Sequence, residues 1–546
     1  MNAHAADDYP FRPEERPAFP GSPYVPSHPM RRRFGYVLVA CLLGITATLG
    51  NALVSVNVAN LSGALGIYVE QASWLPAIYV AMNASANLLL VKARAQFGIT
   101  AVTYGLLSAY IAAALLQFIA PGFASAVVIR GISGIMAAGL TTLTVYNLMQ
   151  VFSIKARPAA LLIGSTLPQL ATPLARLVPV EMLSLDSWSG LHMIELGLGL
   201  SALAAVLWLP LPPSERSKAF EPLDLLTIGL LMPAITLFCC AVNEGRLLWW
   251  TDTPWLGWAL AAAVPLFVLA ILVERSRARP LLQIGWLSSL DILRFAAIAL
   301  LMRLALAEQT YGAVGLLTSS GLTNDQFHTL FAWVLVAMLA GLVTCVATAR
   351  AERLPYQVIV AALAIAAGAW LDTEANNLTR PAQLYWSQGL ISFGTTLFFG
   401  PTLVYGFLRM FERGPDHLVS LIVLFSITQS VGGLVGSAAL GTYQVAAARG
   451  HLQAISERVS ADNPLVTQRI GEGTISLSGV LVDPAARAGQ GSGQLVQAMN
   501  REANVLAFND VFRLVSFLAL GTAAYVAYVI AFNKLKRRLW KSRHTL

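Results

Sequence analysis

Charged residues are scarce in this chain. Only 12% of its 546 residues are Asp, Glu, Lys or Arg, whereas 56% are hydrophobic, and the mean hydropathy is +0.64. Many of the apolar runs approach the ~20 residues that a helix needs to cross a bilayer. We therefore predict an all-α polytopic membrane protein.

Cysteine and histidine are also few. The four cysteines lie inside apolar runs, no CxxC pair indicates zinc or redox chemistry, and the seven histidines are scattered. No nucleophile–base pair or phosphate-binding loop is evident either. The sequence thus predicts no metal site, no cofactor and no enzyme. The net charge of +8 does not indicate nucleic acid, because the basic residues lie in short loops between apolar runs, where they set orientation.

About fourteen membrane spans are expected from the lengths of the apolar runs. They are 34–58, 73–91, 99–118, 124–150, 158–180, 190–211, 222–242, 255–273, 291–317, 328–348, 355–371, 385–407, 417–442 and 510–532.

Basic residues fall in alternate loops between these spans. The basic loops carry Lys92, Arg94, Lys155, Arg157, Arg216, Lys218, Arg275, Arg277, Arg279, Arg350, Arg353, Arg409 and Arg413. The opposite loops carry little beyond Arg246 and Arg380. Positive charge near spans favours the cytoplasmic side, so both termini are predicted to be cytoplasmic, as an even span count requires.

Three segments lie outside the spans. We predict that residues 1–33 form a disordered, Pro-rich cytoplasmic tail and that 534–546 form a basic cytoplasmic tail. The longest loop, 443–509, is expected on the outer side. Apolar stripes near 445–459 and 495–506 predict two helical arms within it. The pattern is equally consistent with a self-contained hairpin and with arms that bind a partner.

Two spans carry arginines in apolar surroundings. Arg130 lies about two turns into the fourth span, and Arg176 follows Pro168 and Pro173 in the fifth. A charge inside a span costs at least ~2.5–3.5 kcal/mol, so it usually faces a bundle interior or a water-filled cavity. We favour a transport pathway with the prolines as gate candidates. The alternative is that the arginines reach the interface or lock helices together.

Further polar residues lie within spans. They are Asn51, Asn57, His192 and Glu195 in the first half of the chain, and Arg303, Glu308, Gln309 and Gln429 in the second. His192 and Glu195 share a helix face, whereas Arg303 and Glu308 are about 140° apart and are not expected to pair. A lone polar residue in a span usually bonds another helix. A carboxylate is harder to explain in that way.

Several motifs follow one another in a recognisable order. RGISGIMAAG at 130–139 is similar to R-x-x-Q-G, and NEGRLLWWTDT at 243–253 is similar to D-x-G-x-x-x-x-W-F-x-S. ITQSVGGLVG at 427–436 is similar to T-R-x-x-G-G-x-x-G, with Gln429 replacing arginine, and ANVLAFNDVF at 503–512 resembles the start of a last span. Together they resemble the major facilitator superfamily, specifically its fourteen-span drug:proton antiporters of the EmrB type.

The chain departs from this family at functional positions. LGNALVSVNVAN in the first span resembles L-D-x-T-x-x-N-V-A-L-P, but Gly50 stands at the acidic position. The family's aspartate there shares in proton coupling. The loop after the second span, VKARAQFGIT, keeps only Gly98 of the family's G-x-L-x-D-R-x-G-R.

The resemblance implies two six-helix bundles, 34–211 and 291–533, with two inserted spans at 222–273. It implies a secondary transporter in the bilayer of the bacterial inner membrane, exporting small amphipathic organic substrates in exchange for protons. A periplasmic membrane-fusion adaptor and an outer-membrane channel would be its partners. The alternatives are a non-transporting scaffold or sensor, and an exporter or uniporter of one metabolite without proton coupling.

The missing aspartate directs attention to other polar groups. Coupling candidates are Arg130, Arg176, His192, Glu195, Arg303 and Glu308, and cavity-lining candidates are Asn51, Asn57, Gln309 and Gln429. We predict that Glu195, helped by His192, pairs with Arg130 or Arg176 and exchanges that partner for a proton or an anionic substrate group. A static salt bridge is the alternative, and Glu308 is the reserve coupling residue.

Overall fold

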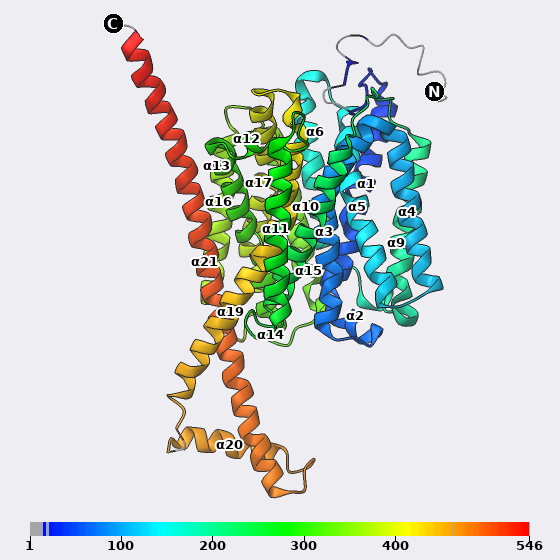
Figure 1. The fold of residues 1–546 in the computed structure, drawn as a ribbon. Helices are drawn as coiled ribbons and strands as arrows, with labels where there is room; N and C mark the ends of the chain where they lie inside the picture. Colours follow the sequence, from blue (N-terminus) through cyan, green and yellow to red (C-terminus); the bar gives the residue numbers. More distant parts are fainter. Residues whose placement is uncertain (1–11, 13–14, 18–20, 461, 545–546) are drawn as a thin grey trace.

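The computed structural model describes residues 12, 15–17, 21–460 and 462–544, and it is a bundle of long helices (Figure 1). Within these residues, the one β-bridge joins Pro23 to Ser214. The core lies along the centre of the bundle, where side chains such as Leu43, Leu107 and Phe398 are fully buried. The predicted all-α membrane fold is confirmed.

Within the described residues, twelve helical segments are long and apolar enough to cross a membrane. Their main helices are α1 (Met30–Val56), α3 (Val69–Phe97), α4 (Ile99–Ile119), α5 (Phe123–Met149), α9 (Leu185–Trp208), α10 (Pro222–Gly245), α11 (Pro254–Ser276), α15 (His328–Ala347), α16 (Leu354–Leu371), α17 (Tyr385–Phe411), α19 (Gly432–Ser456) and α21 (Pro484–His544). Each overlaps a predicted span. α19 is preceded without a break by α18 (Leu418–Ser426) and the π-helical turn η10 (Ile427–Val431).

The predicted fifth and ninth spans are interrupted helices. The fifth comprises α6 (Arg157–Thr166), η4 (Leu167–Leu170) and α7 (Ala171–Arg176), and the ninth comprises α13 (Leu290–Ala305), η5 (Glu308–Ala313) and α14 (Val314–Ser319). Proline lacks an N–H donor, and Pro168 falls in the 3₁₀ turn of the fifth. The Thr48 hydroxyl of α1 donates to the carbonyl of Pro168 at 2.7 Å, which stabilises the broken backbone. The count of fourteen spans, which includes these two, stays a prediction.

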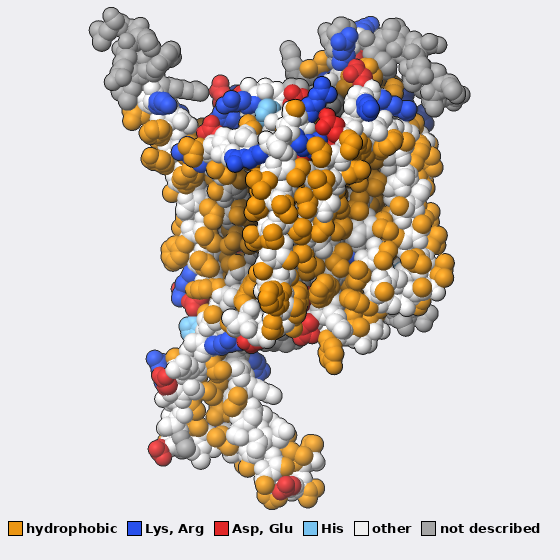
Figure 2. Space-filling model, in the orientation of Figure 1, with side chains coloured by type: hydrophobic (Ala, Val, Ile, Leu, Met, Phe, Trp, Pro, Cys, Tyr) orange, Lys and Arg blue, Asp and Glu red, His pale blue; other side chains and the backbone are white. Residues whose placement is uncertain are grey.

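The two ends of the bundle differ. α1 begins and α21 finishes at one end, which we call the terminal end, whereas α20 (Pro464–Ser476) and the adjoining parts of α19 and α21 protrude from the other, the arm end (Figure 1). On the face shown in Figure 2, Lys and Arg side chains gather at the terminal end above a belt of hydrophobic side chains. Such a belt is what a bilayer requires of the surface that contacts its hydrocarbon.

The protruding arms are helical, and they pack on each other. α19 continues to Ser456, and α21 begins at Pro484, earlier than the apolar stripe near 495–506 indicated. His451 on α19 contacts Asp510 on α21, with Nε2 and Oδ2 2.7 Å apart. α20 forms in the Gly- and Ser-containing middle of the loop. α20 lies close against α21, and glycine at position 491 permits this approach. A Cβ on Gly491 would lie 2.7 Å from the Ile470 carbonyl oxygen.

The described part of the N-terminal tail packs on the bundle, whereas a disordered tail over residues 1–33 as a whole stays a prediction. Residues 21–29 pack against the terminal end of the bundle, where Ser22 and Val25 are buried. The Tyr24 amide donates to the Pro213 carbonyl at 3.0 Å, and Gln150 at the end of α5 donates to the Tyr24 carbonyl at 3.0 Å. The prolines hold this segment extended, and neighbouring groups of the bundle make hydrogen bonds to its backbone N–H and carbonyl groups. Residues 1–11, 13–14 and 18–20 lie outside the described part of the chain.

His28 makes the docking of this segment sensitive to pH. Its Nε2 lies 3.0 Å from Oε1 of Gln150, which accepts the bond because the amide nitrogen of Gln150 donates elsewhere. Burial lowers the pKa of His28 below its ordinary value of 6.5, against an opposing effect of the Gln150 hydrogen bond. The neutral ring therefore stabilises the docked tail fully above the ordinary pKa of 6.5, and this contribution is lost as the pH falls through the lowered pKa of the docked form.

We expect residues 21–29 to lose hydrogen-exchange protection between pH 7.5 and 5.5, after correction for the intrinsic pH dependence of exchange. His28→Gln retains a donor for Gln150 but does not titrate, so its protection should be independent of pH over this range. The same loss of protection in the variant would rule out His28 as the cause.

Candidate functional site

The first half of the bundle contains a buried ion pair between two helices. Arg130 of α5 donates to Oε1 of Glu195 of α9, and both side chains are almost completely excluded from solvent. His192 lies one turn before Glu195 on α9, with Nδ1 3.8 Å from Oε2 of the carboxylate. The three predicted residues Arg130, His192 and Glu195 are thus brought together, and their arrangement neutralises a charge that would be costly to bury alone.

Gly50 of α1 leaves room for this carboxylate. A Cβ placed on Gly50 would lie 2.7 Å from Oε1 of Glu195, closer than two such atoms can approach. In the family that the motifs resemble, this position carries an aspartate. Here the sixth predicted span supplies a carboxylate to the space in front of it, and an acidic side chain at position 50 would collide with Glu195.

Neighbouring helices hold α5 in place beside the pair. Gly134 lets α3 approach so closely that a Cβ there would come within 2.5 Å of the Tyr79 carbonyl. Tyr79 donates in turn to the Ala47 carbonyl of α1 at 2.9 Å. The glycine of the RGISG motif is therefore needed for packing, which sets the position of Arg130 one turn earlier.

Several buried polar atoms around the pair have no hydrogen-bond partner. They are Nη1 of Arg130, Oε2 of Glu195, Nδ1 of His192 and Oε1 of Gln117 on α4. A cavity of about 10 Å³, close to the volume of one water probe, is lined by Gln117, Arg130 and His192 among apolar side chains. Gln117 was not among the predicted site residues, although a polar residue in the third apolar run was a visible signal.

The two predicted asparagines of the first span do not line this cavity. Asn57 donates to the Leu53 carbonyl at 2.9 Å, one turn back on its own helix. Oδ1 of Asn51 is buried without a partner.

Arg176 does not join the Glu195 cluster. It donates to Oδ1 of Asn324 at 3.1 Å, Asn324 donates back to the Arg176 carbonyl at 3.3 Å, and the guanidinium lies 5.5 Å from the centre of the Phe331 ring. Asn324 begins η6 (Asn324–Phe327), which leads into α15. Arg176 therefore connects the first half of the chain to the second near the arm end.

Arg303 and Gln429 meet where two helices are interrupted. Nε of Arg303 donates to the Gln429 carbonyl of η10 at 2.8 Å, and the guanidinium lies 5.7 Å from the centre of the Phe399 ring. Both amide atoms of Gln429 are buried without partners. Gln309 instead donates to the Ser392 hydroxyl of α17 at 2.6 Å.

Glu308 contacts Gln388 of α17, with the amide donating to Oε1 at 3.1 Å. The same amide donates to Asp372. No ion pair joins Glu308 to Arg303 among the described residues, in agreement with their angular separation along the helix. Asp372 and Gln388 were not predicted site residues, because each lies near the end of an apolar run, where polar residues are common.

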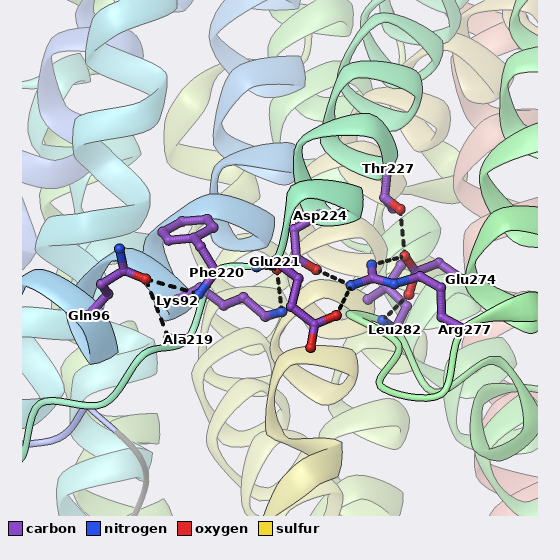
Figure 3. A network of polar contacts seen from close by, with 10 residues as sticks. All are labelled: Lys92, Gln96, Ala219, Phe220, Glu221, Asp224, Thr227, Glu274, Arg277 and Leu282. Carbon is purple, nitrogen blue, oxygen red and sulfur yellow. Dashed lines mark hydrogen bonds and ion pairs between the residues drawn. The ribbon is translucent and has the colours of Figure 1, made fainter.

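A second charged network ties the hairpin of α10 and α11 to α3 near the terminal end (Figure 3). Asp224 of α10 accepts from Lys92 of α3 at 2.5 Å and from Arg277 at 2.7 Å. Arg277 also donates to Glu274 of α11 at 2.8 Å, and Glu274 accepts from the Thr227 hydroxyl at 2.5 Å. Lys92 and Arg277, which the sequence presents as orientation signals, are therefore also structural cross-links.

Replacing Asp224 tests the strength of this network. In Asp224→Asn, Lys92 and Arg277 lose their shared negative partner in a largely buried position, so we expect a loss of roughly 3 kcal/mol in stability. The measurement is thermal unfolding of the detergent-purified protein. Glu412→Gln breaks the exposed Arg409–Glu412 pair instead and should change the midpoint little. Equal effects of the two substitutions would contradict a special role of the network.

Known structures show what fold this bundle has. Neither the protein-family models nor the curated proteins give a match to the sequence. Among solved structures, the human organic anion transporter MFSD10 superposes with a TM-score of 0.52 at 14% identity, covering 90% of this chain and 100% of its own.

Two other transporter structures give a similar result. The major facilitator proton:xylose symporter XylE has a TM-score of 0.52 at 13% identity, covering 90% of this chain and 95% of its own. A bacterial homologue of the human peptide transporters PepT1 and PepT2 has a TM-score of 0.51 at 14% identity, covering 93% and 99%. The chain therefore has the fold of the major facilitator transporters. The narrower resemblance to the EmrB type stays a prediction.

Proposed function

We propose that this protein is a secondary active transporter that exports small amphipathic organic compounds across the bacterial inner membrane in exchange for protons. The observation that carries the proposal is the buried Arg130–Glu195 pair beside Gly50, within a fold that other transporters share. Alternating access between two half-bundles is the motion that such folds use.

The pair provides a means of exchanging a proton for a ligand. A buried ion pair is stable only while both charges are present, and removal of one leaves the other uncompensated. Protonation of Glu195 would free Arg130 to bind an anionic or polar group of the substrate. The unpartnered Nη1 of Arg130 and Oε2 of Glu195 offer unused hydrogen-bonding capacity for this step. His192, whose side chain is 14% exposed, connects the carboxylate to the margin of the cavity.

Contacts between the two halves are suited to opening and closing. The Ser430 hydroxyl of η10 donates to Oδ1 of Asn83 of α3 at 2.9 Å. On the other side of the bundle, Arg176 and Asn324 exchange hydrogen bonds. Neutral and single-charge contacts of this kind are weak enough to be exchanged as the halves rock against each other.

The test uses Glu195→Gln in liposomes, with a panel of fluorescent amphipathic dyes of both charges. We expect the variant to lose dye accumulation driven by a pH gradient and to retain dye exchange in the absence of a gradient, because the amide cannot release a proton. Glu181→Gln, at an exposed position of α8 (Val180–Leu183), is the matched control and should keep both modes.

Each alternative predicts a different result in the same assay. Full activity of Glu195→Gln in both modes would end the coupling proposal. Exchange without any effect of pH in the wild type would favour an uncoupled exporter or uniporter. No transport of any dye by a folded wild type would favour a scaffold or sensor, and loss of folded Glu195→Gln protein would favour a static salt bridge.

The arms extend the proposal to a partner. The tip of the loop exposes apolar side chains that contribute little to the bundle, among them Leu465, Ile475, Val480 and Val482, of which Val482 is 94% exposed. Exposed apolar groups clustered in this way are typical of interaction sites. We infer that the arms lie in the periplasm and bind a membrane-fusion adaptor, which leads to an outer-membrane channel.

Replacing both Val480 and Val482 with serine should reduce binding to a purified membrane-fusion adaptor at least several-fold, because it removes the most exposed apolar area of the tip. Affinity can be measured by interferometry with the transporter in nanodiscs. Val69→Ser makes the same chemical change at an exposed position of the arm end outside the arms, at the start of α3, and should bind normally. Unchanged binding of the double variant would exclude the tip from the interface.

A further inference from the structure

The second half of the bundle buries two carboxylates beside one amide. Gln388 of α17 donates from the same nitrogen to Oε1 of Glu308 at 3.1 Å and to Oδ2 of Asp372 at 3.0 Å. The two carboxylate oxygens therefore lie within about 6 Å of each other. They come from different spans, since Glu308 begins the π-helical turn η5 and Asp372 begins η7 (Asp372–Glu374) after α16.

Neither carboxylate has a cationic partner. Glu308 is fully buried and Asp372 is 2% exposed, and neither takes part in an ion pair within the described residues. Arg303 on α13 is directed to the Gln429 carbonyl, and Arg246 lies over the ring of Tyr311. The neutral donors beside them, the Gln388 amide, the Ser387 hydroxyl and the Ala313 backbone amide, cannot compensate two full negative charges in surroundings of low dielectric constant.

One carboxylate oxygen of this pair has no hydrogen-bond donor. Oε2 of Glu308 is buried and has no hydrogen-bond partner. The side chain is enclosed by Gly312 and by Phe512 of α21, since a Cβ on Gly312 would lie 3.4 Å from Oε1 of Glu308 and 2.9 Å from the Phe512 ring. A buried carboxylate oxygen without a donor is expensive unless it carries a proton. Helices also tend to contain π-turns such as η5 where they serve a function.

We propose that Glu308 and Asp372, bridged by Gln388, form a proton-binding site in which the two carboxylates share a single proton. Two carboxylates this close in an apolar interior do not both ionise, so one holds the proton while the other accepts from the amide. Release of that proton leaves two like charges within about 6 Å of each other, and their repulsion favours separation of η5 from η7. The site thus links proton occupancy to the packing of the ninth, eleventh and twelfth predicted spans.

The position of Asp372 places the site near one end of the bundle. Asp372 directly follows the last residue of α16, and Glu374, two residues later, is exposed, so the surface nearest to the site along this chain segment is at the arm end. Tyr311 and Phe508 pack against each other, and Tyr311 donates to Gln444. The farther titratable groups of the packed helices, His451 and Asp510, bind each other.

Infrared spectroscopy of the purified protein in lipid tests the site without any substrate. Protonated carboxyl groups absorb separately from carboxylates, and the wild type at pH 7 should show the band of one buried protonated carboxyl. Glu308→Gln should abolish that band, because Asp372 then ionises without a like-charged neighbour, whereas in Asp372→Asn the band of Glu308 should disappear at a lower pH than in the wild type. Glu195→Gln should keep it, because Glu195 is ionised beside Arg130.

The outcomes separate this proposal from the proposed function, because no transport is measured. Absence of the band in the wild type would overturn the shared proton, as would its persistence at full strength in both single variants. If one variant fails to fold, the spectrum of the other variant and the loss of the wild-type band at high pH still show whether these two carboxylates hold the proton. Stabilisation of the wild type by sodium chloride but not choline chloride, without the band, would show a bound metal cation instead.

Discussion

The structure depends on the neutralisation of charge inside an apolar bundle. Water is not present to solvate an ion there, so each buried charge requires a partner or a proton. Arg130 and Glu195 satisfy this requirement as a pair, and Lys92, Asp224 and Arg277 satisfy it as a network. Glu308 and Asp372 lie on either side of one neutral amide with no cationic partner among the described residues, and two like charges placed in this way call for a chemical explanation.

Local irregularities of the helices create the space for these groups. Gly50 lacks the Cβ that would collide with Glu195, and Gly312 lacks the one that would crowd Glu308. The π-helical turns η5 and η10 lie at Glu308 and Gln429, and the 3₁₀ turn at Pro168 interrupts the fifth predicted span. A regular helix would present these side chains at fixed angular positions about its axis. The irregular turns change those positions, and they occur at the polar sites.

The inserted hairpin and the N-terminal segment add constraints at the terminal end. α10 packs on α3 through the Lys92–Asp224–Arg277 network, and the Gln283 amide donates to the Ser420 hydroxyl of α18 at 2.8 Å. The hairpin and the loop that follows it therefore contact both halves of the bundle. Residues 21–29 cover a neighbouring part of the same end through Tyr24 and His28. The motion of the half-bundles that we propose for transport must accommodate both attachments.

The sequence by itself determined the all-helical membrane fold, the approximate positions of the twelve long apolar helices among the described residues and the helical character of the arms, because hydropathy and periodicity are local properties. It also indicated that Arg130 needs an anion and that Glu195 was available. Only the tertiary structure decided that Glu195 faces Arg130 and not Arg176, that Asp372 and Gln388 join Glu308, and that residues 21–29 are docked. Those contacts join residues far apart in the chain, and rotation of each helix about its axis sets them. That rotation follows from the packing of all neighbouring helices together, which no local pattern contains.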